Sequence, residues 1–273
     1  MPALNMGDTR FDNGARLIDF TAWPPAKRRI ARANNFIVEW RTAAGVLTGF
    51  ESTAEVFVLF AADGGAILGP HGRTTAPPDS VVITPPGAFE VEFAGSGAAV
   101  IIATDRLDCP GEAQARDALV APIGRPFRRL KPLEQPEVWP VQDIPYPPDN
   151  KRLKFIQSAT MSINLVVYDG PRGNTALTPH AHADFEQGSL SVDGDFVHHL
   201  RTPWGPNGGD WREDVHAEAG VASLVLVPPT LIHTSEGVLP GRHFLVDIFA
   251  PPRRDFIAKG WVVNAADYED PLK

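Results

Sequence analysis

The 273-residue sequence lacks several features that would assign a protein to a narrow class. Cys109 is the only cysteine, so the chain forms no internal disulfide, as expected in a reducing compartment. No apolar run reaches the ~18 residues of a membrane span, and the first residues hold no apolar segment typical of a secretion signal. We therefore expect a soluble, cytoplasmic protein with no membrane partner.

Positive charge is also scarce. The chain has 25 Lys and Arg against 33 Asp and Glu, which gives a formal net charge of −8. Such a balance argues against nucleic acid as a partner. Two basic clusters, residues 27–32 and 125–131, depart from it, and we interpret each as a solvated face or an inter-domain contact.

Helical periodicity is nearly absent, and the best candidate helix is residues 111–120. Strand signals dominate, because short runs rich in β-branched and aromatic residues lie between turns that draw on 24 glycines and 27 prolines. These runs form two sets, within residues 34–104 and 161–249. Asp63-Gly64 and Asp193-Gly194 lie between strand runs and predict hairpin turns.

A proline-rich segment separates the two sets of strands. Proline at this density neither continues a helix nor donates to a sheet ladder, so the segment predicts an extended connector. We therefore expect three parts: an N-terminal domain at residues 1–120, a connector at 121–150 and a C-terminal domain at 151–273.

The two strand sets also align with each other as a repeat. "VVITPPGAFE" (81–90) matches "LVLVPPTLIH" (224–233) at an offset of 143 residues, which places Glu90 opposite His233. "GFESTAE" (49–55) matches "HAHADFE" (180–186) at an offset of 131. The difference predicts about a dozen extra residues in the second copy, and we assign them to residues 201–216.

"TPHAHADFEQG" (178–188) holds the strongest chemical signal. Residues i and i+2 of a strand share a face, so His180 and His182 can present both imidazoles to one centre. Glu186 lies at i+6, and His233 follows the Pro-Pro pair of another strand. Three imidazoles and a carboxylate suit a divalent transition metal, and we predict these four residues as its ligands. The alternative is a polar loop that happens to contain two histidines.

These residues resemble the cupin superfamily, whose pattern is HxHxxxE, a following glycine, and a later strand end with proline and histidine. The motifs here are "GNTALTPHAHADFEQGSLSVDG" and "GVASLVLVPPTLIHTS". The resemblance implies an all-β fold with two cupin-type antiparallel jelly-roll barrels in one chain. It implies the same four ligands, although Gln187 adjoins Glu186 and either residue can supply the oxygen. Thr230 stands where the family usually has glycine, and Gly173 lies one residue farther from the first histidine than usual.

The N-terminal copy has no histidine at the corresponding positions. We therefore expect a bicupin whose degenerate N-terminal barrel binds no metal. The residues that replace the ligands are Gly49, Glu51, Glu55 and Glu90.

The ligand set predicts one bound divalent transition metal: Fe, Mn, Ni or Zn. Four ligands on an octahedral ion leave two positions open, which suits catalysis. We expect an enzyme that acts on a small organic, carboxylate-bearing substrate, with dioxygenase chemistry slightly favoured. The alternatives are a sugar-acid isomerase or lyase, and a bicupin that binds a metal or small ligand without turnover.

Other residues add weaker indications. The inserted segment holds Trp204 and Trp211, which either close over a substrate or pack the segment onto the barrel. The candidate catalytic residues are His216, Gln187 and Arg212. His198 and His199 are adjacent, so at most one faces the interior, and a surface role is favoured for each. Barrels of the kind that the resemblance implies expose sheet edges, so by analogy we expect a homodimer. Residues 1–33 are expected to pack either across its interface or onto the chain's own barrel.

Overall fold

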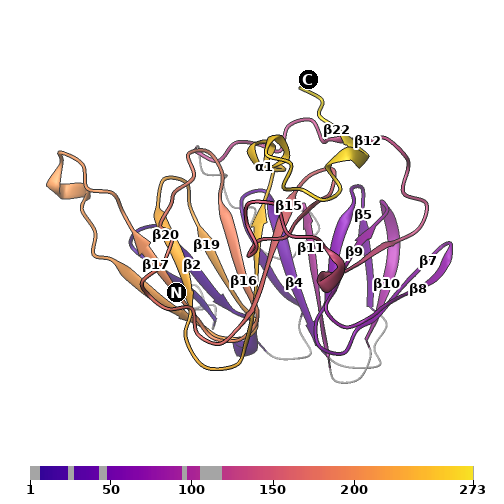
Figure 1. Ribbon diagram of the computed structural model, residues 1–273, viewed down its shortest axis with the longest axis horizontal. Coiled ribbons are helices and arrows are strands. Elements are labelled where there is room, and N and C mark those ends of the chain that lie inside the picture. The colour runs from indigo at the N-terminus through magenta and orange to yellow at the C-terminus, as the bar shows by residue number, and fades with distance from the viewer. Residues whose placement is uncertain (1–6, 24–27, 43–47, 94–96, 105–118, 273) are drawn as a thin grey trace, which may run out of the picture. The chain divides into compact units, whose positions relative to one another are not determined.

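The structure is a computed structural model that describes residues 7–23, 28–42, 48–93, 97–104 and 119–272, and it is all-β, as predicted (Figure 1). Within these ranges the one α-helix is α1 (Arg254–Ala258), and none is long and apolar enough to cross a membrane. The helix expected at residues 111–120 lies outside the described residues, except for its last two, which form a turn and a bend.

The chain divides into two compact units that interleave along the sequence. Unit 1 consists of Met1–Pro24, Ala115–Ala121 and Asn164–Phe249, and unit 2 consists of Pro25–Gln114, Pro122–Ile163 and Ala250–Lys273. The strands of unit 1 are β1 (Asp8–Arg10), β2 (Arg16–Asp19), β15 (Ser162–Asp169), β16 (Gln187–Asp193), β17 (Phe196–Arg201), β18 (Val215–Ala219), β19 (Ser223–Val227), β20 (Ile232–Gly237) and β21 (Arg242–Phe249). Its 3-10 turns are η1 (Phe20–Ala22) and η3 (Gly208–Asp210).

Unit 2 is built in the same way. Its strands are β3 (Arg29–Arg32), β4 (Phe36–Thr42), β5 (Thr48–Ser52), β6 (Val56–Phe60), β7 (Gly65–Gly69), β8 (Gly72–Ala76), β9 (Ser80–Thr84), β10 (Gly87–Phe93), β11 (Ala98–Thr104), β12 (Arg128–Arg129), β13 (Glu137–Pro140), β14 (Phe155–Gln157) and β22 (Tyr268–Glu269). Two 3-10 turns, η2 (Val141–Asp143) and η4 (Ala265–Asp267), accompany α1.

The two units share one strand order. In unit 2 the larger sheet contains β9-β6-β11-β4 and the smaller sheet is β5-β10-β7-β8. In unit 1 the corresponding orders are β19-β16-β21-β15 and, after the segment around His180, β20-β17-β18. The register agrees as well, because Glu90 pairs with Gly49 in unit 2 and His233 pairs with His180 in unit 1. The strand order and register therefore match the repeat that the sequence predicts.

The predicted hairpins at the two Asp-Gly turns are wrong. Gly64 and Gly194 do adopt positive φ angles of 67° and 84°, as tight turns require. The strands on either side, however, belong to different sheets, since β6 and β16 lie in the larger sheets and β7 and β17 in the smaller ones. An Asp-Gly pair specifies a turn but not which sheet the next strand joins.

Three other segments resolve expectations from the sequence. The inserted residues of the second copy fall between β17 and β18, as predicted. The N-terminal hairpin of β1 and β2 joins the chain's own unit 1, where β2 pairs with β19. Part of the proline-rich segment forms β13, the edge strand beside β9, where a proline that donates no ladder hydrogen bond is tolerated.

The interiors of the two units differ in polarity. In unit 2, Val56, Val58 and Phe60 of β6 are buried in a cluster of apolar side chains. The equivalent strand of unit 1 carries three buried polar residues instead: Gln187, Ser189 and Ser191. The same strand position therefore carries apolar side chains in unit 2 and polar ones in unit 1.

Glu55, the residue that the repeat places opposite Glu186, is a structural centre of unit 2. Its buried carboxylate accepts hydrogen bonds from the Ala159 amide and the Tyr268 hydroxyl, both at 2.8 Å, and from Arg129 Nη1 at 3.3 Å. These contacts tie the proline-rich segment and the C-terminal segment to the loop before β6.

We expect Glu55→Ala to lower the free energy of unfolding by about 3 kcal/mol, because it leaves buried donors without their acceptor. Denaturant unfolding of the full chain measures this change. The matched control is Glu92→Ala, which removes an exposed ion pair with Arg73 and is expected to cost much less, because solvent screens exposed pairs. Equal effects of the two substitutions would contradict a special role for Glu55.

Candidate metal centre

A pair of backbone hydrogen bonds brings the two histidine motifs together. The His180 amide donates to the His233 carbonyl at 3.1 Å, and the His233 amide donates to the His180 carbonyl at 2.8 Å. The Thr230 amide donates to the His182 carbonyl at 2.6 Å. The segment 178–182 therefore runs as an added strand beside the start of β20.

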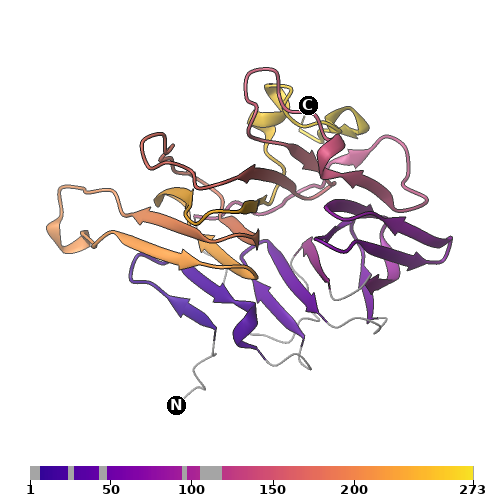
Figure 2. The ribbon, with the colours of Figure 1, turned by 60° about the horizontal axis from the view of Figure 1, so that its bottom comes forward.

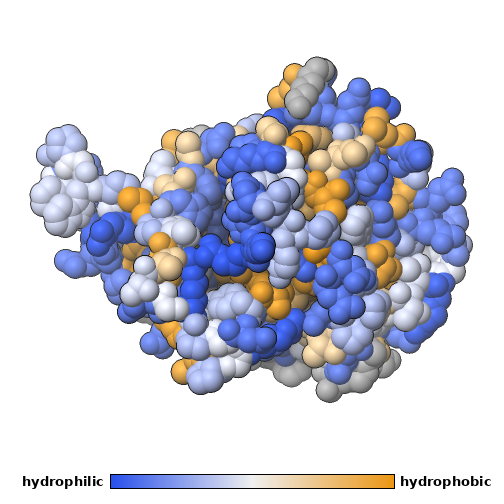
Figure 3. Space-filling model, in the orientation of Figure 1, coloured by the Kyte–Doolittle hydropathy of each residue, from blue (hydrophilic) through white to orange (hydrophobic). Residues whose placement is uncertain are grey.

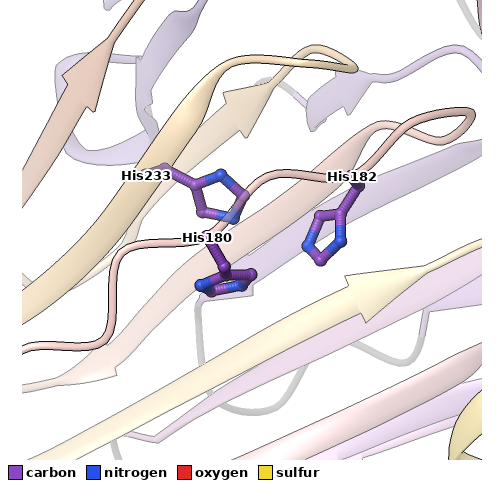
Figure 4. Close-up of side chains that lie close together, drawn as sticks. All are labelled: His180, His182 and His233. Carbon is purple, nitrogen blue, oxygen red and sulfur yellow. The ribbon is translucent and has the colours of Figure 1, made fainter. Parts of the chain in front are cut away.

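The three predicted histidine ligands converge. Each of His180, His182 and His233 offers one ring nitrogen, and these nitrogens lie within 4.8 Å of one another (Figure 4). His180 is exposed, His182 is half-buried and His233 is buried, so the cluster is open to solvent on the side of His180. Phe185 stacks on the His182 ring and Phe249 meets the same ring edge-on, so apolar side chains support the half-buried member.

The hydrogen bonds of two histidines leave their Nε2 atoms available. His180 Nδ1 is 2.9 Å from the Thr178 carbonyl, and His233 Nδ1 is 3.0 Å from the Leu231 carbonyl. Because a carbonyl only accepts, each Nδ1 carries the proton and each Nε2 presents a lone pair. Burial lowers the pKa of His233 to about 4, which keeps this ring neutral near pH 7, the form that binds metal ions.

Gln187 is the oxygen donor that faces the imidazoles. Its Oε1 lies 2.8 Å from His182 Nε2 and 3.1 Å from His233 Nε2. Its Nε2 donates to Ser189 Oγ at 2.9 Å and to Asp247 Oδ1 at 3.1 Å. The two acceptors on the far side thus orient the amide so that its oxygen points toward the histidines.

Asp247 holds this arrangement from inside the unit. Its carboxyl also accepts hydrogen bonds from Ser189 Oγ at 2.8 Å and Asn164 Nδ2 at 3.0 Å. Burial raises the pKa of Asp247, although these hydrogen bonds act in the opposite direction. A buried carboxyl behind a neutral donor is a common way to fix a ligand's orientation and strengthen it as a donor.

The donor set fits a divalent transition metal. The lone pair of His233 Nε2 faces the lone pairs of Gln187 Oε1 at 3.1 Å, and with Nδ1 protonated no hydrogen lies between these two acceptors. A cation at this point relieves the repulsion. Three imidazole nitrogens and one amide oxygen are ligands that such ions accept.

Glu186 does not join this group. It is buried at the residue before β16, and the cluster of converging acidic and histidine side chains in the described part of the chain contains the three histidines only. Successive residues entering a strand point to opposite faces, so Gln187 and Glu186 cannot both face the interior. Of the two oxygen donors left open by the sequence, Gln187 lies against the imidazoles.

The remaining candidates lie elsewhere. His216 is exposed and pairs with His199, while Arg212 donates to the Gly209 and Trp211 carbonyls of its own loop. His198 is buried, whereas its sequence context favoured a surface role. In "FVHHL" the buried residues Phe196, His198 and Leu200 alternate with Val197 and His199. This alternation places His198 on the same face as two apolar residues, which is the signal that indicates its inward position.

The inserted loop does not cover the metal cluster. The rings of Trp204 and Trp211 stack 4.8 Å apart, and both residues are exposed. Figures 1 and 2 show the loop between β17 and β18 projecting away from its sheet, and its tip protrudes from the surface in the view of Figure 3. The cleft of about 1180 Å³ beside it is lined by the N-terminal hairpin and the loop, and none of the four converging residues lines it.

Unit 2 has no comparable cluster. Among its described residues no three acidic or histidine side chains converge. Glu90 pairs through its backbone with Gly49, and Glu55 serves the structural role described above.

Thr230, which stands where the resemblance leads us to expect glycine, has a left-handed backbone conformation with a φ of 69°. The equivalent residue of unit 2 is Gly87, whose φ is 127°. Left-handed backbone costs a non-glycine residue about 1–2 kcal/mol, and a glycine loses about 0.5–1 kcal/mol of chain entropy. Thr230→Gly is therefore expected to stabilise the protein by about 1 kcal/mol, a rise of a few degrees in Tm by calorimetry. Gly87→Ala serves as the control of opposite sign, and a lower Tm for Thr230→Gly would contradict the argument.

His198 predicts a pH dependence of stability. Burial, and then the nearby His233 and His199, lower its pKa to about 3. The unfolded chain therefore binds a proton that the folded chain does not, and this contribution to stability is lost as the pH falls from about 6.5 towards 3 at about 1.4 kcal/mol per pH unit. Urea unfolding of wild type and His198→Asn across this window is expected to show a shallower slope for the variant. Parallel slopes would exclude a buried neutral His198.

Comparison with known proteins places the fold. No family model matches the chain, and no curated protein matches its sequence. Among solved structures, the protein Ylba from E. coli matches with a TM-score of 0.56 and 11% identity, covering 89% of this chain and 93% of that one. Oxalate decarboxylase from Bacillus subtilis, described for its Mn(II) centres, matches at 0.52 and 10%, covering 89% and 75%. A glyoxylate-induced protein from Pseudomonas aeruginosa matches at 0.51 and 14%, covering 90% and 85%.

At these identities the likeness shows the fold alone. The chain has the all-β, antiparallel jelly-roll fold of these proteins, which supports the resemblance to the cupin superfamily seen in its motifs.

Proposed function

We propose that this protein is a metal-dependent enzyme of the cupin type that acts on a small carboxylate-bearing substrate. The observation that carries the proposal is the convergence of three imidazoles and the Gln187 oxygen at a site open to solvent. His180, His182, His233 and Gln187 would hold the ion, with Gln187 in the role that the sequence analysis gave to Glu186.

When bound, the ion supplies Lewis-acid polarisation of a substrate oxygen. The protein's own residues orient the donors and shape the site. The Asp247 network holds the Gln187 amide in place, the carbonyls of Thr178 and Leu231 select the Nδ1–H tautomers, and the Phe185 and Phe249 rings limit water around His182.

The solved neighbours support the substrate class. They include oxalate decarboxylases, one of them in complex with formate, and a glyoxylate-induced protein. Oxalate, formate and glyoxylate are small carboxylates, and two adjacent oxygens suit chelation of an ion with two free positions. The same neighbours favour manganese among the four predicted metals. Dioxygenase chemistry stays a prediction.

We also propose that the chain is a bicupin in which only the C-terminal barrel binds a metal. The shared strand order of the two units supports a bicupin, and the apolar interior of unit 2 supports a degenerate N-terminal barrel without metal. A homodimer remains our expectation for the assembly.

Elemental analysis and metal titration test the ligands. Wild type is expected to bind one equivalent of Mn(II) or Fe(II) at this centre, and His180→Ala/His233→Ala is expected to lose it. Gln187→Leu is expected to weaken binding by at least about 10- to 100-fold, since loss of even an outer partner of a ligand costs that much, whereas Glu186→Gln leaves it unchanged. Thermal unfolding of each variant controls for folding. If Glu186→Gln weakens metal binding and Gln187→Leu does not, Glu186 is the ligand. Retention of metal by the double histidine variant would exclude the site.

Turnover is tested with the metal-loaded protein against two- to four-carbon oxo- and dicarboxylic acids, with oxygen uptake and carbon dioxide release recorded together. We expect activity that His180→Ala abolishes. Full metal occupancy without turnover of any of these acids would contradict the enzyme proposal and favour a bicupin that binds a metal without catalysis.

A further inference from the structure

A second histidine cluster lies on the outer face of the sheet formed by β18, β17 and β20. Adjacent residues of a strand point to opposite faces, so His199 faces away from the buried His198. In the antiparallel register His199 lies directly opposite His216 of β18. The proposed function uses neither of these two side chains.

Their hydrogen bonds define the tautomer of His199. Its Nε2 lies 3.1 Å from Glu236 Oε2, and its Nδ1 lies 2.7 Å from His216 Nδ1. A carboxylate only accepts, so the Nε2 of a neutral His199 carries the proton and its Nδ1 presents a lone pair. The proton between the two rings then belongs to His216.

This is the arrangement in which proteins prepare a histidine for a metal ion. A metal-binding imidazole usually donates its other N–H to a carboxylate, which fixes the ring and makes the free nitrogen more basic. Glu236 does this for His199. His216 frees its own Nδ1 by moving its proton to Nε2, on the far side of the ring.

The spacing of the two nitrogens suits a shared ion. Metal–imidazole distances are about 2.0–2.1 Å, so the two nitrogens have to move apart by roughly half an ångström to hold an ion between them. His199 is half-buried and His216 is exposed, so both rings have room for this shift. Glu218 is exposed two residues after His216 on the same face, and with Glu236 it adds negative charge that attracts a cation.

We propose that His199 and His216 chelate a second divalent transition metal, with Glu236 as the residue that positions His199. Two imidazoles with water completing the shell suit Cu(II), Ni(II) or Zn(II). The ion lies at the base of the projecting loop, because His199 is two residues before the end of β17 and His216 is the second residue of β18. It joins the two strands where they leave the sheet.

The experiment separates this site from the first centre. The starting protein is His180→Ala/His233→Ala, which lacks two ligands of the first centre, and the probe is Zn(II) in isothermal titration calorimetry. We expect one equivalent of Zn(II). Adding His216→Ala is expected to weaken binding by more than about 100-fold, since loss of even an outer partner costs about 10- to 100-fold.

Two further variants sharpen the result. Glu236→Gln keeps an acceptor for His199 but removes the charge, and it is expected to weaken binding by about tenfold. His71→Ala removes an exposed histidine in a turn of unit 2 and is the matched control, for which we expect no change.

A folded starting variant that takes up no Zn(II), or whose uptake survives His216→Ala, would overturn the second site. If the starting variant does not fold, the wild-type protein replaces it, and His216→Ala is expected to reduce the bound Zn(II) from two equivalents to one. Unchanged stoichiometry there overturns the proposal too. Failure of the first centre remains distinguishable, because His216→Ala would then lower the wild-type stoichiometry from one equivalent of Zn(II) to none.

Discussion

The metal centre depends on two backbone hydrogen bonds between His180 and His233, which lie 53 residues apart in the chain. They align the segment 178–182 with the start of β20, so three imidazoles meet at one point. Unit 2 contains the same pairing between Gly49 and Glu90. The pairing is therefore a property of the fold, and the side chains placed on it decide whether a metal centre forms.

The residues on the inward face of β16 and of its equivalent, β6, decide whether an oxygen donor faces the paired segment. In β16 this face carries Gln187, whose amide is oriented by Asp247, and buried polar groups of this kind need partners because an unpaired one is costly. In β6 the equivalent residue is Val56, which packs in an apolar cluster. The hydrogen bond from the Gln187 amide nitrogen to Asp247 leaves the Gln187 oxygen directed at the histidines. An apolar interior gives stability and no ligand.

Much of this was predictable from sequence patterns. Alternation of apolar residues predicts strands because side chains of a strand alternate between faces, and the offsets of 143 and 131 predict the common strand order and the site of the insertion. The three histidine ligands follow from HxH and from the histidine after the Pro-Pro pair. The prediction of hairpins at the two Asp-Gly turns was wrong because a turn signal is local, whereas the sheet that a strand joins depends on partners far along the chain.

The sequence by itself determined the all-β class, the repeat and the three imidazoles of the site. Only the tertiary structure placed the Gln187 oxygen, and not Glu186, against the imidazoles, because adjacent residues point to opposite faces and only packing sets which face is inward. It also decided the pairing of His199 with His216, since their contact comes from strand register and not from spacing. The alternation of side chains can be found in the sequence of each strand, but which of the two faces points inward is set by the residues packed against that strand.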